Sequence, residues 1–181
     1  MTDTVILANL TDLTRSALAP VLAITDSAKS AVAGLVTENG RISAQLIEQH
    51  QTAAHGLAWL ATYAQALQQM QSWADRLTTD NRFSEVEALI LQIAFGEYLS
   101  QIAGGIQMNQ TEVVRAADLG LTPADLAPLN APAPAALMAR GNTQAARSML
   151  AQLMQDRAAE LTVGASGLDA ELEMIRDQFR R

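Results

Sequence analysis

The stretch that decides the fold is residues 41–77, RISAQLIEQHQTAAHGLAWLATYAQALQQMQSWADRL. Apolar residues recur in it at spacings of three and four, which is the period of one face of an α-helix. The residues of this stripe are Ile42, Leu46, Ala53, Leu57, Leu60, Ala64, Leu67, Ala74 and Leu77. A second stripe runs along another side of the same helix, through Trp59, Tyr63, Ala66, Met70 and Trp73. We therefore predict one long helix that has packing partners on more than one side.

The charge pattern of this helix supports the same prediction. No Asp, Glu, Lys or Arg occurs between Gln51 and Ala74. A helix on the surface of a protein normally carries a charged face, so this one is expected to be covered. The same stretch holds five Gln residues, which argues against a helix that faces lipid.

Two further long helices are predicted beside it. Residues 3–39 have helical periodicity with a break or kink at Pro20, and Asn39-Gly40 is a good stop signal. Residues 84–119 form the other helix, which opens with capping-box spacing between Ser84 and Glu87. The polar loop at 78–81 is short, so the helices on either side of it are expected to be antiparallel neighbours of about 50 Å each.

The C-terminal third is predicted to be less regular. Thr122-Pro123-Ala124-Asp125 opens a short helix, residues 127–134 read as a proline-rich linker, and residues 142–163 as a fourth long helix. Residues 164–167 are expected to be a flexible joint. The last fourteen residues keep helical spacing but carry no stop signal, so either a helix frays there or the chain is cut inside a helix of a second domain. We favour the second interpretation.

Composition sets the class of protein. The chain of 181 residues has 34 Ala and 15 Gln, while aromatic residues make up 4%, which predicts an all-α fold. The absence of Cys excludes disulfides, thiolate metal sites and cysteine nucleophiles. A net charge of −7 with scattered Arg argues against nucleic acid as a partner. No uninterrupted apolar run reaches the length of a membrane span, and no signal pattern opens the chain, so we expect a cytoplasmic protein.

Few residues are candidates for chemistry. His50 and His55 are five apart, a spacing that does not suit two ligands on one helix face, so we expect helix packing and no metal site. Glu97 is the lone charge of its helix between Ala88 and Thr111 and is expected to face solvent or a partner subunit, the alternative being a general base. Gly104-Gly105 interrupts the helical pattern and indicates a close backbone approach or a local opening of the helix. We predict no catalytic residue.

Three stretches together resemble a known family. Ala54–Tyr63, followed by Ala66–Met70, resembles the N-terminal extension of the methylsuccinyl-CoA dehydrogenase type within the acyl-CoA dehydrogenase family. Gln101–Gly105 is similar to the Q-I-x-G-G segment in the C-terminal helical domain of that family. Leu172–Arg181 looks like the first helix of the family's catalytic unit.

The resemblance implies a fold and a division into domains. Residues 1–166 would be a helical extension, similar to the family's own C-terminal four-helix bundle. Residues 167–181 would be a linker and the start of the first helix of a truncated catalytic unit.

The resemblance also implies a function. The parent would be an FAD-dependent enzyme that oxidises methylsuccinyl-CoA to mesaconyl-CoA, and this chain would dock on the parent's core through its second and third helices. Gln101, Gly104 and Gly105 would be the cofactor contacts. The following Ile106–Asn109 lacks the family's Tyr and Arg, so no cofactor is expected on this segment itself.

Two other functions stay open from the residues alone. The chain could be a free-standing helical module that mediates protein–protein interaction or homo-oligomerisation, without enzymatic activity. It could also be a bundle that holds a ligand in a pocket around Glu97 and the two histidines.

Overall fold

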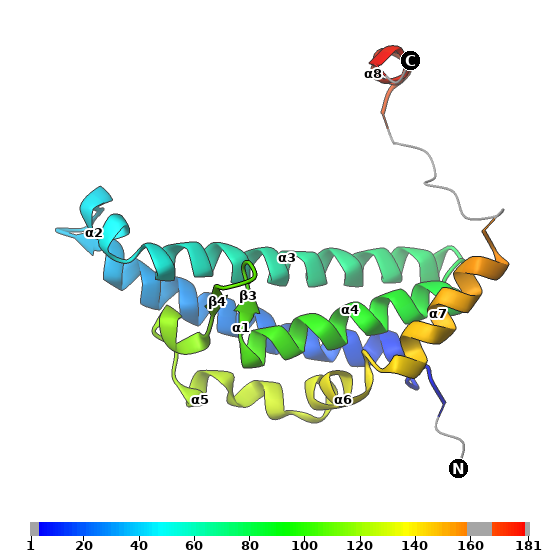
Figure 1. Ribbon diagram of the computed structural model, residues 1–181, viewed down its shortest axis with the longest axis horizontal. Helices are drawn as coiled ribbons and strands as arrows, with labels where there is room; N and C mark the ends of the chain where they lie inside the picture. Colours follow the sequence, from blue (N-terminus) through cyan, green and yellow to red (C-terminus); the bar gives the residue numbers. More distant parts are fainter. Residues whose placement is uncertain (1–3, 159–167, 180–181) are drawn as a thin grey trace.

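The computed structural model describes residues 4–158 and 168–179. Within these residues the chain is all-α, as predicted, apart from two small hairpins. Three long helices form the body: α1 (Leu10–Val36), α3 (Gln51–Thr79) and α4 (Glu85–Gly104). They run side by side in alternating directions (Figure 1), so the predicted antiparallel pairing of the second and third long helices is confirmed.

The first helix is not broken at its proline, so of the two predicted alternatives the break is wrong. Helix α1 continues through Pro20. A proline inside a helix leaves the carbonyl four residues earlier without its usual donor, here that of Ser16. Ser16 is exposed, and water can serve as the replacement donor. The buried face of α1 keeps the helical spacing that the sequence predicts, through Val21, Ile24, Ala28, Val32 and Val36. Leu35, which the same spacing placed on this face, is exposed.

Helix α1 is also long and apolar enough to cross a membrane, judged by length and composition alone. In the structure its buried stripe packs against α3, α4 and α6. Its other side carries charged residues such as Arg15 and Lys29, both exposed. This division into one buried and one polar side is the pattern of an amphipathic helix in a bundle.

A β-hairpin separates α1 from the next helices, where a simple helix stop was predicted. Strand β1 (Thr37–Glu38) pairs antiparallel with β2 (Arg41–Ile42). Asn39 and Gly40 form the turn, with φ of 53° and 74°. Positive φ at both central residues is the requirement of the tight hairpin turn that Asn-Gly favours. The helix predicted for 41–77 is therefore shorter, and it is divided at His50 into α2 (Ala44–Gln49) and α3.

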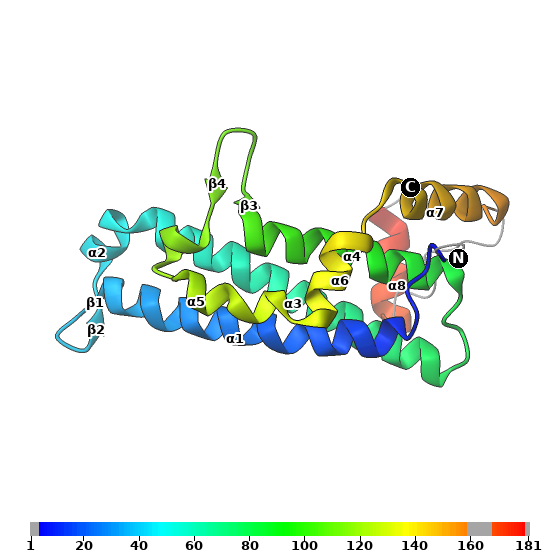
Figure 2. The same ribbon diagram turned by 90° about the horizontal axis from the view of Figure 1, so that it is seen from below.

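The third long helix ends well before the predicted Leu119. Helix α4 stops at Gly104, and Gly105 has a φ of 134°, a conformation that side chains disfavour. The chain then forms a second hairpin from β3 (Ile106–Gln107) and β4 (Val113–Val114), which projects from the bundle (Figure 2). A 3₁₀ turn, η1 (Ala116–Leu119), follows it. Helix α4 is consequently about 30 Å long, not 50 Å.

The predicted proline-rich linker is ordered and helical. After α5 (Pro123–Leu126), which begins where the sequence predicted, come the 3₁₀ turn η2 (Ala127–Asn130) and α6 (Pro132–Arg140). The prolines lie in first turns, where no backbone N–H is needed and the fixed φ suits a helix. These short segments pack on α1 and α4 and take the fourth side of the bundle, with Leu129, Pro134 and Leu137 buried.

Helices α7 and α8 follow the short segments of the fourth side. The predicted fourth long helix is α7 (Gln144–Asp156), which packs on α4. The predicted joint at 164–167 lies outside the described residues. The predicted terminal helix is α8 (Ala170–Phe179), which has no buried residue and exposes Leu172, Ile175 and Phe179. The domain boundary at residue 166 stays a prediction.

Helix α4 is the central element of the core. It is exposed at only four positions, Glu85, Ser100, Ala103 and Gly104. Phe95, Leu91 and Leu99 are fully buried on it. Helices α3, α6 and α7 all pack against it, which explains why its sequence carries so little charge.

The capping box at the start of α4 is confirmed. The backbone N–H of Ser84 donates to Glu87 Oε2 at 2.9 Å, and the Ser84 hydroxyl contacts the same oxygen. Burial acts to raise the pKa of Glu87. The hydrogen bonds from Ser84 and from the backbone, together with nearby Arg157, outweigh burial and hold that pKa below its ordinary value.

Replacing Glu87 with Gln is expected to destabilise the fold by about 1 kcal/mol at neutral pH. Because the folded-state pKa of Glu87 is lowered, its stabilisation is present above the ordinary carboxyl pKa and is lost as the pH falls through the lowered value. The difference between wild type and Glu87→Gln in urea unfolding should therefore shrink on acidification. Glu85→Gln, at an exposed position of the same turn, is the control; an equal and pH-independent effect of both changes would contradict the assignment.

Candidate functional site

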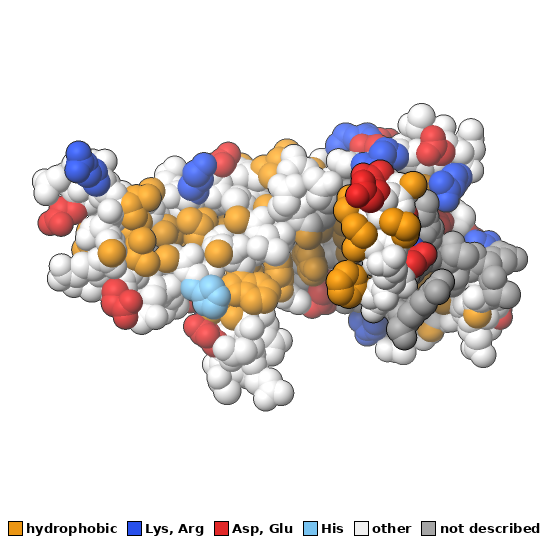
Figure 3. Space-filling view, turned by 90° about the horizontal axis from the view of Figure 1, so that it is seen from above, with side chains coloured by type: hydrophobic (Ala, Val, Ile, Leu, Met, Phe, Trp, Pro, Cys, Tyr) orange, Lys and Arg blue, Asp and Glu red, His pale blue; other side chains and the backbone are white. Residues whose placement is uncertain are grey.

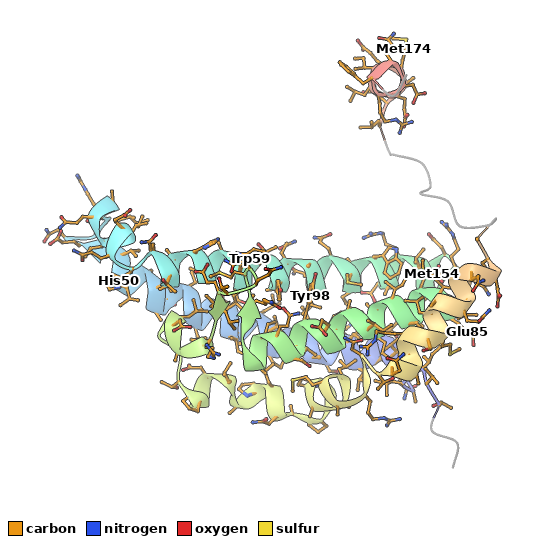
Figure 4. The ribbon with its side chains drawn as sticks, in the orientation of Figure 1. His50, Trp59, Glu85, Tyr98, Met154 and Met174 are labelled. Atoms are coloured by element: carbon orange, nitrogen blue, oxygen red, sulfur yellow. The ribbon has the colours of Figure 1, made fainter. Side chains whose placement is uncertain are left out.

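An aromatic group fills the space between α3 and α4. The rings of Tyr63 and Tyr98 stack with centroids 4.4 Å apart and an interplanar angle of 15°. Trp59 meets Tyr63 edge-on at 6.3 Å, and its indole N–H donates to His55 Nε2 at 3.1 Å. Figure 4 shows Trp59 on α3 and Tyr98 on α4, in the layer between the two helices. The predicted second stripe of α3 is thus helix-packing surface.

A polar network begins at this aromatic group. The Tyr63 hydroxyl donates to Gln101 Oε1 at 2.6 Å, and Gln101 Nε2 donates to Glu97 Oε1 at 2.5 Å. Burial, with Tyr98 and Glu97 nearby, raises the pKa of Tyr63, so its hydroxyl keeps the proton that it donates. Both the oxygen and the nitrogen of the Gln101 side-chain amide are therefore hydrogen-bonded.

Glu97 is the junction of this network. Its other oxygen, Oε2, accepts a hydrogen bond from Asn142 Nδ2 at 2.6 Å, and Arg147 in turn donates to Asn142 Oδ1 at 2.7 Å. The expectation that Glu97 faces solvent or a partner is corrected: the side chain is half-buried and ties α4 to the start of α7. Both carboxylate oxygens of Glu97 therefore already accept hydrogen bonds from amides, which suits a structural role better than that of a base.

The two glycines that end α4 have different surroundings. Gly104 is exposed, and a side-chain carbon added there would meet nothing within 4 Å. At Gly105 such a carbon would lie 2.6 Å from Val113 Cγ1, so the predicted close approach is found at this second glycine. The contact between Gly105 and Val113 holds the end of α4 against β4.

A cavity of 410 Å³ opens beside Gly104. It lies between the end of α4 and the short segments η1, α5, η2 and α6. Its walls are mainly apolar, and they include Arg115, Thr122 and Asn130 at exposed positions. Neither Glu97 nor the two histidines line this cavity, so the hypothesis of a ligand pocket around those three residues does not describe it.

The three predicted cofactor contacts do not converge. Gly104 lines the cavity, whereas Gln101 faces Tyr63 and Glu97 and Gly105 packs on Val113. That any of them contacts FAD stays a prediction.

The described residues also offer no cluster for a metal. In residues 4–158 and 168–179 no group of three or more His, Asp or Glu side chains is placed to hold an ion. His55 uses Nε2 as the acceptor for Trp59.

Taken together, these features define a helical domain with a polar network between its long helices and a mainly apolar cavity beside the end of α4. No model of a known protein family matches the sequence. The chain is 52% identical, over its whole length, to a (2S)-methylsuccinyl-CoA dehydrogenase from Cereibacter sphaeroides. This identity confirms the resemblance to the methylsuccinyl-CoA dehydrogenase type. The likeness of residues 101–105 and 172–181 to other parts of the acyl-CoA dehydrogenase family stays a prediction. The chain spans 32% of the length of that relative.

Proposed function

We propose that this chain is a non-catalytic helical domain of an FAD-dependent acyl-CoA dehydrogenase that oxidises (2S)-methylsuccinyl-CoA to mesaconyl-CoA. In that reaction bound FAD would supply the acceptor for the hydride of the β-carbon, and a base of the parent protein would take the α-proton. The chain's own residues would build and attach the domain. The catalytic groups would belong to the remainder of the parent protein.

The observation that carries this proposal is the 52% identity over the whole chain with about a third of the relative. Such identity supports a common fold and a common role within the larger protein. The site is consistent with the division of labour, because Glu97 is already bonded to two amides and the candidate FAD contacts point to different surroundings.

The outer face of α3 is the surface that we propose for docking on the dehydrogenase core. Between Gln51 and Ala74 its exposed residues are uncharged: Gln51, Thr52, His55, Ala58, Ala61, Thr62, Gln65, Gln68 and Gln69. Figure 3 shows hydrophobic and neutral polar side chains over the middle of the face that α3 presents, with charges mostly toward its edges. An uncharged face loses little hydration free energy when a partner covers it. Docking through α4 was also predicted, but that helix is almost entirely covered inside this chain.

Replacing Ala61 with Arg is expected to weaken attachment of the domain to the dehydrogenase core at least about tenfold, because the new charge must be desolvated at the interface. The free energy of unfolding should change by less than about 0.5 kcal/mol, since Ala61 is exposed. Ala33→Arg, at an exposed position of α1, is the matched control. The measurement is the binding of the separately produced domain to the core; an equal loss in both variants would contradict docking through α3.

The non-catalytic assignment is tested by absorbance at flavin wavelengths. The purified 181-residue chain should carry no FAD after reconstitution, whereas the protein from the complete reading frame should carry it. Stoichiometric FAD on the 181-residue chain would overturn the assignment.

A free-standing interaction module is the second candidate, and the uncharged face of α3 is the observation that favours it. In that case α3 would pack on a separate protein or on a second copy of the chain. The two functions differ in what the reading frame encodes beyond Arg181. A frame that continues into a dehydrogenase core supports the first, and one that ends there supports the second.

A further inference from the structure

The cavity beside Gly104 has the size and lining of a small-molecule site. Its 410 Å³ lies within the range of ligand pockets, which combine apolar walls with a few polar groups. Leu121 and Leu129 at the inner side are 7% and 2% exposed, while Arg115, Thr122 and Asn130 are exposed residues. The cavity is therefore apolar at its floor and polar at its mouth.

The floor continues toward the core. A second, narrow cavity of 10 Å³ shares Arg115, Ala116, Leu121 and Leu126 with the first. Its other walls are core residues such as Ile24 and Leu60, both 2% exposed. Apart from Arg115, the side chains that line this inner end are apolar.

The mouth carries a cation without an acidic partner. Among the described residues no Asp or Glu forms an ion pair with the Arg115 guanidinium. The nearest acids in the sequence, Glu112 and Asp118, accept hydrogen bonds from Asn109 Nδ2 at 3.0 Å and from the Arg115 backbone N–H at 2.8 Å. Asp125, farther along the chain, accepts from the Thr122 backbone N–H at 2.7 Å. Thr122 holds the pKa of Asp125 below its ordinary value, so that carboxylate stays an acceptor in its own cap.

We propose that this cavity binds an amphipathic carboxylate, with the apolar chain inside and the carboxylate on Arg115 at the mouth. Guanidinium and carboxylate match in charge and in planar geometry. The Asn130 amide at the same mouth adds a further hydrogen-bond donor. The proposal goes beyond the function proposed above and does not depend on it, since it concerns only residues of this chain.

Octanoate is the probe, titrated into the 181-residue chain by isothermal calorimetry at neutral pH. We expect binding at a single site, weakened about tenfold or more by Arg115→Gln, because a charge-assisted hydrogen bond is lost. Arg82→Gln, which changes an exposed arginine outside the cavity, should leave the affinity unchanged. 1-Octanol, which has the same chain without the charge, should bind as weakly as octanoate binds to the Arg115→Gln variant.

A variant that fills the cavity separates this site from general surface binding. Ala117 lines the cavity and is exposed, so Ala117→Trp should abolish octanoate binding while unfolding stays near that of wild type. The proposal is overturned if octanoate does not bind, if Arg115→Gln binds as tightly as wild type, or if the alcohol binds as well as the acid.

Discussion

Replacing Gln92 with Leu should lower the free energy of unfolding by about 3 kcal/mol, since buried groups would lose their hydrogen-bond partners. Gln92 is fully buried on α4. Its Oε1 accepts from the Leu7 backbone N–H at 2.7 Å, and its Nε2 donates to the carbonyls of Val5 at 3.0 Å and Gly141 at 3.2 Å. Leu has a similar size but makes none of these bonds.

The measurement is equilibrium unfolding in urea, with Gln68→Leu as the matched control. Gln68 is exposed on α3, so the same change there should alter stability by less than about 0.5 kcal/mol. Hydrogen exchange should also become faster at the Leu7 amide in Gln92→Leu. If both variants unfold at the same urea concentration, the hydrogen bonds of Gln92 do not contribute the expected free energy to the stability of the fold.

Replacing Gly96 with Ala is expected to cost about 2–3 kcal/mol through steric overlap. The added carbon would lie 2.7 Å from the backbone N of Asn142 and 2.9 Å from the carbonyl O of Leu137. These are backbone atoms at the junction of α6 and α7, and they cannot rotate away as a side chain can. The helices would have to separate locally.

Gly34→Ala is the control for that change. Gly34 also lies within a helix, but an added carbon there would meet no atom within 4 Å. Because Ala favours helix over Gly, this variant should be more stable by about 0.5–1 kcal/mol. The urea midpoint is expected to fall in Gly96→Ala and to rise in Gly34→Ala. A stabilising effect of Gly96→Ala would show that α4 does not approach α6 and α7 this closely.

The sequence predicted the long helices well where periodicity, caps and charge agreed. Most of the stripe of α1, the buried positions of α3 from Ala53 to Ala74 and the Ser84–Glu87 cap agree with the predictions. Ile42, which opens the predicted stripe of residues 41–77, lies on β2 and is exposed, and so is Leu35 near the end of α1. The errors lie at Gly and Pro. Asn39-Gly40 is compatible with a helix stop and with a hairpin turn, and only the pairing of β1 with β2 decides between them.

The prolines of residues 127–134 gave the same ambiguity. Proline ends a preceding helix but also suits the first turn of the next, and the latter holds here because Leu129 and Leu137 are buried against the bundle. The predicted length of α4 exceeds the observed one because apolar Ile106 and Val113 continue its helical spacing. In the structure both residues belong to a hairpin.

The candidate site could be predicted from the sequence less well than the fold. Glu97 and Gln101 were singled out, but their partners Tyr63 and Asn142 lie 38 and 45 positions away along the chain. No local pattern links such residues. Arg115 was overlooked because a single arginine in a loop carries no signal until η1, α5 and α6 form a cavity beside it.

The most direct test of the proposed function is the oxidation of (2S)-methylsuccinyl-CoA. The enzyme to be assayed is the protein encoded by the complete reading frame that contains residues 1–181. With an artificial electron acceptor, we predict formation of mesaconyl-CoA by that protein, FAD bound to it, and neither activity nor FAD in the 181-residue chain alone. A complete product that binds no FAD and leaves methylsuccinyl-CoA unchanged would contradict the assignment of this chain to a dehydrogenase.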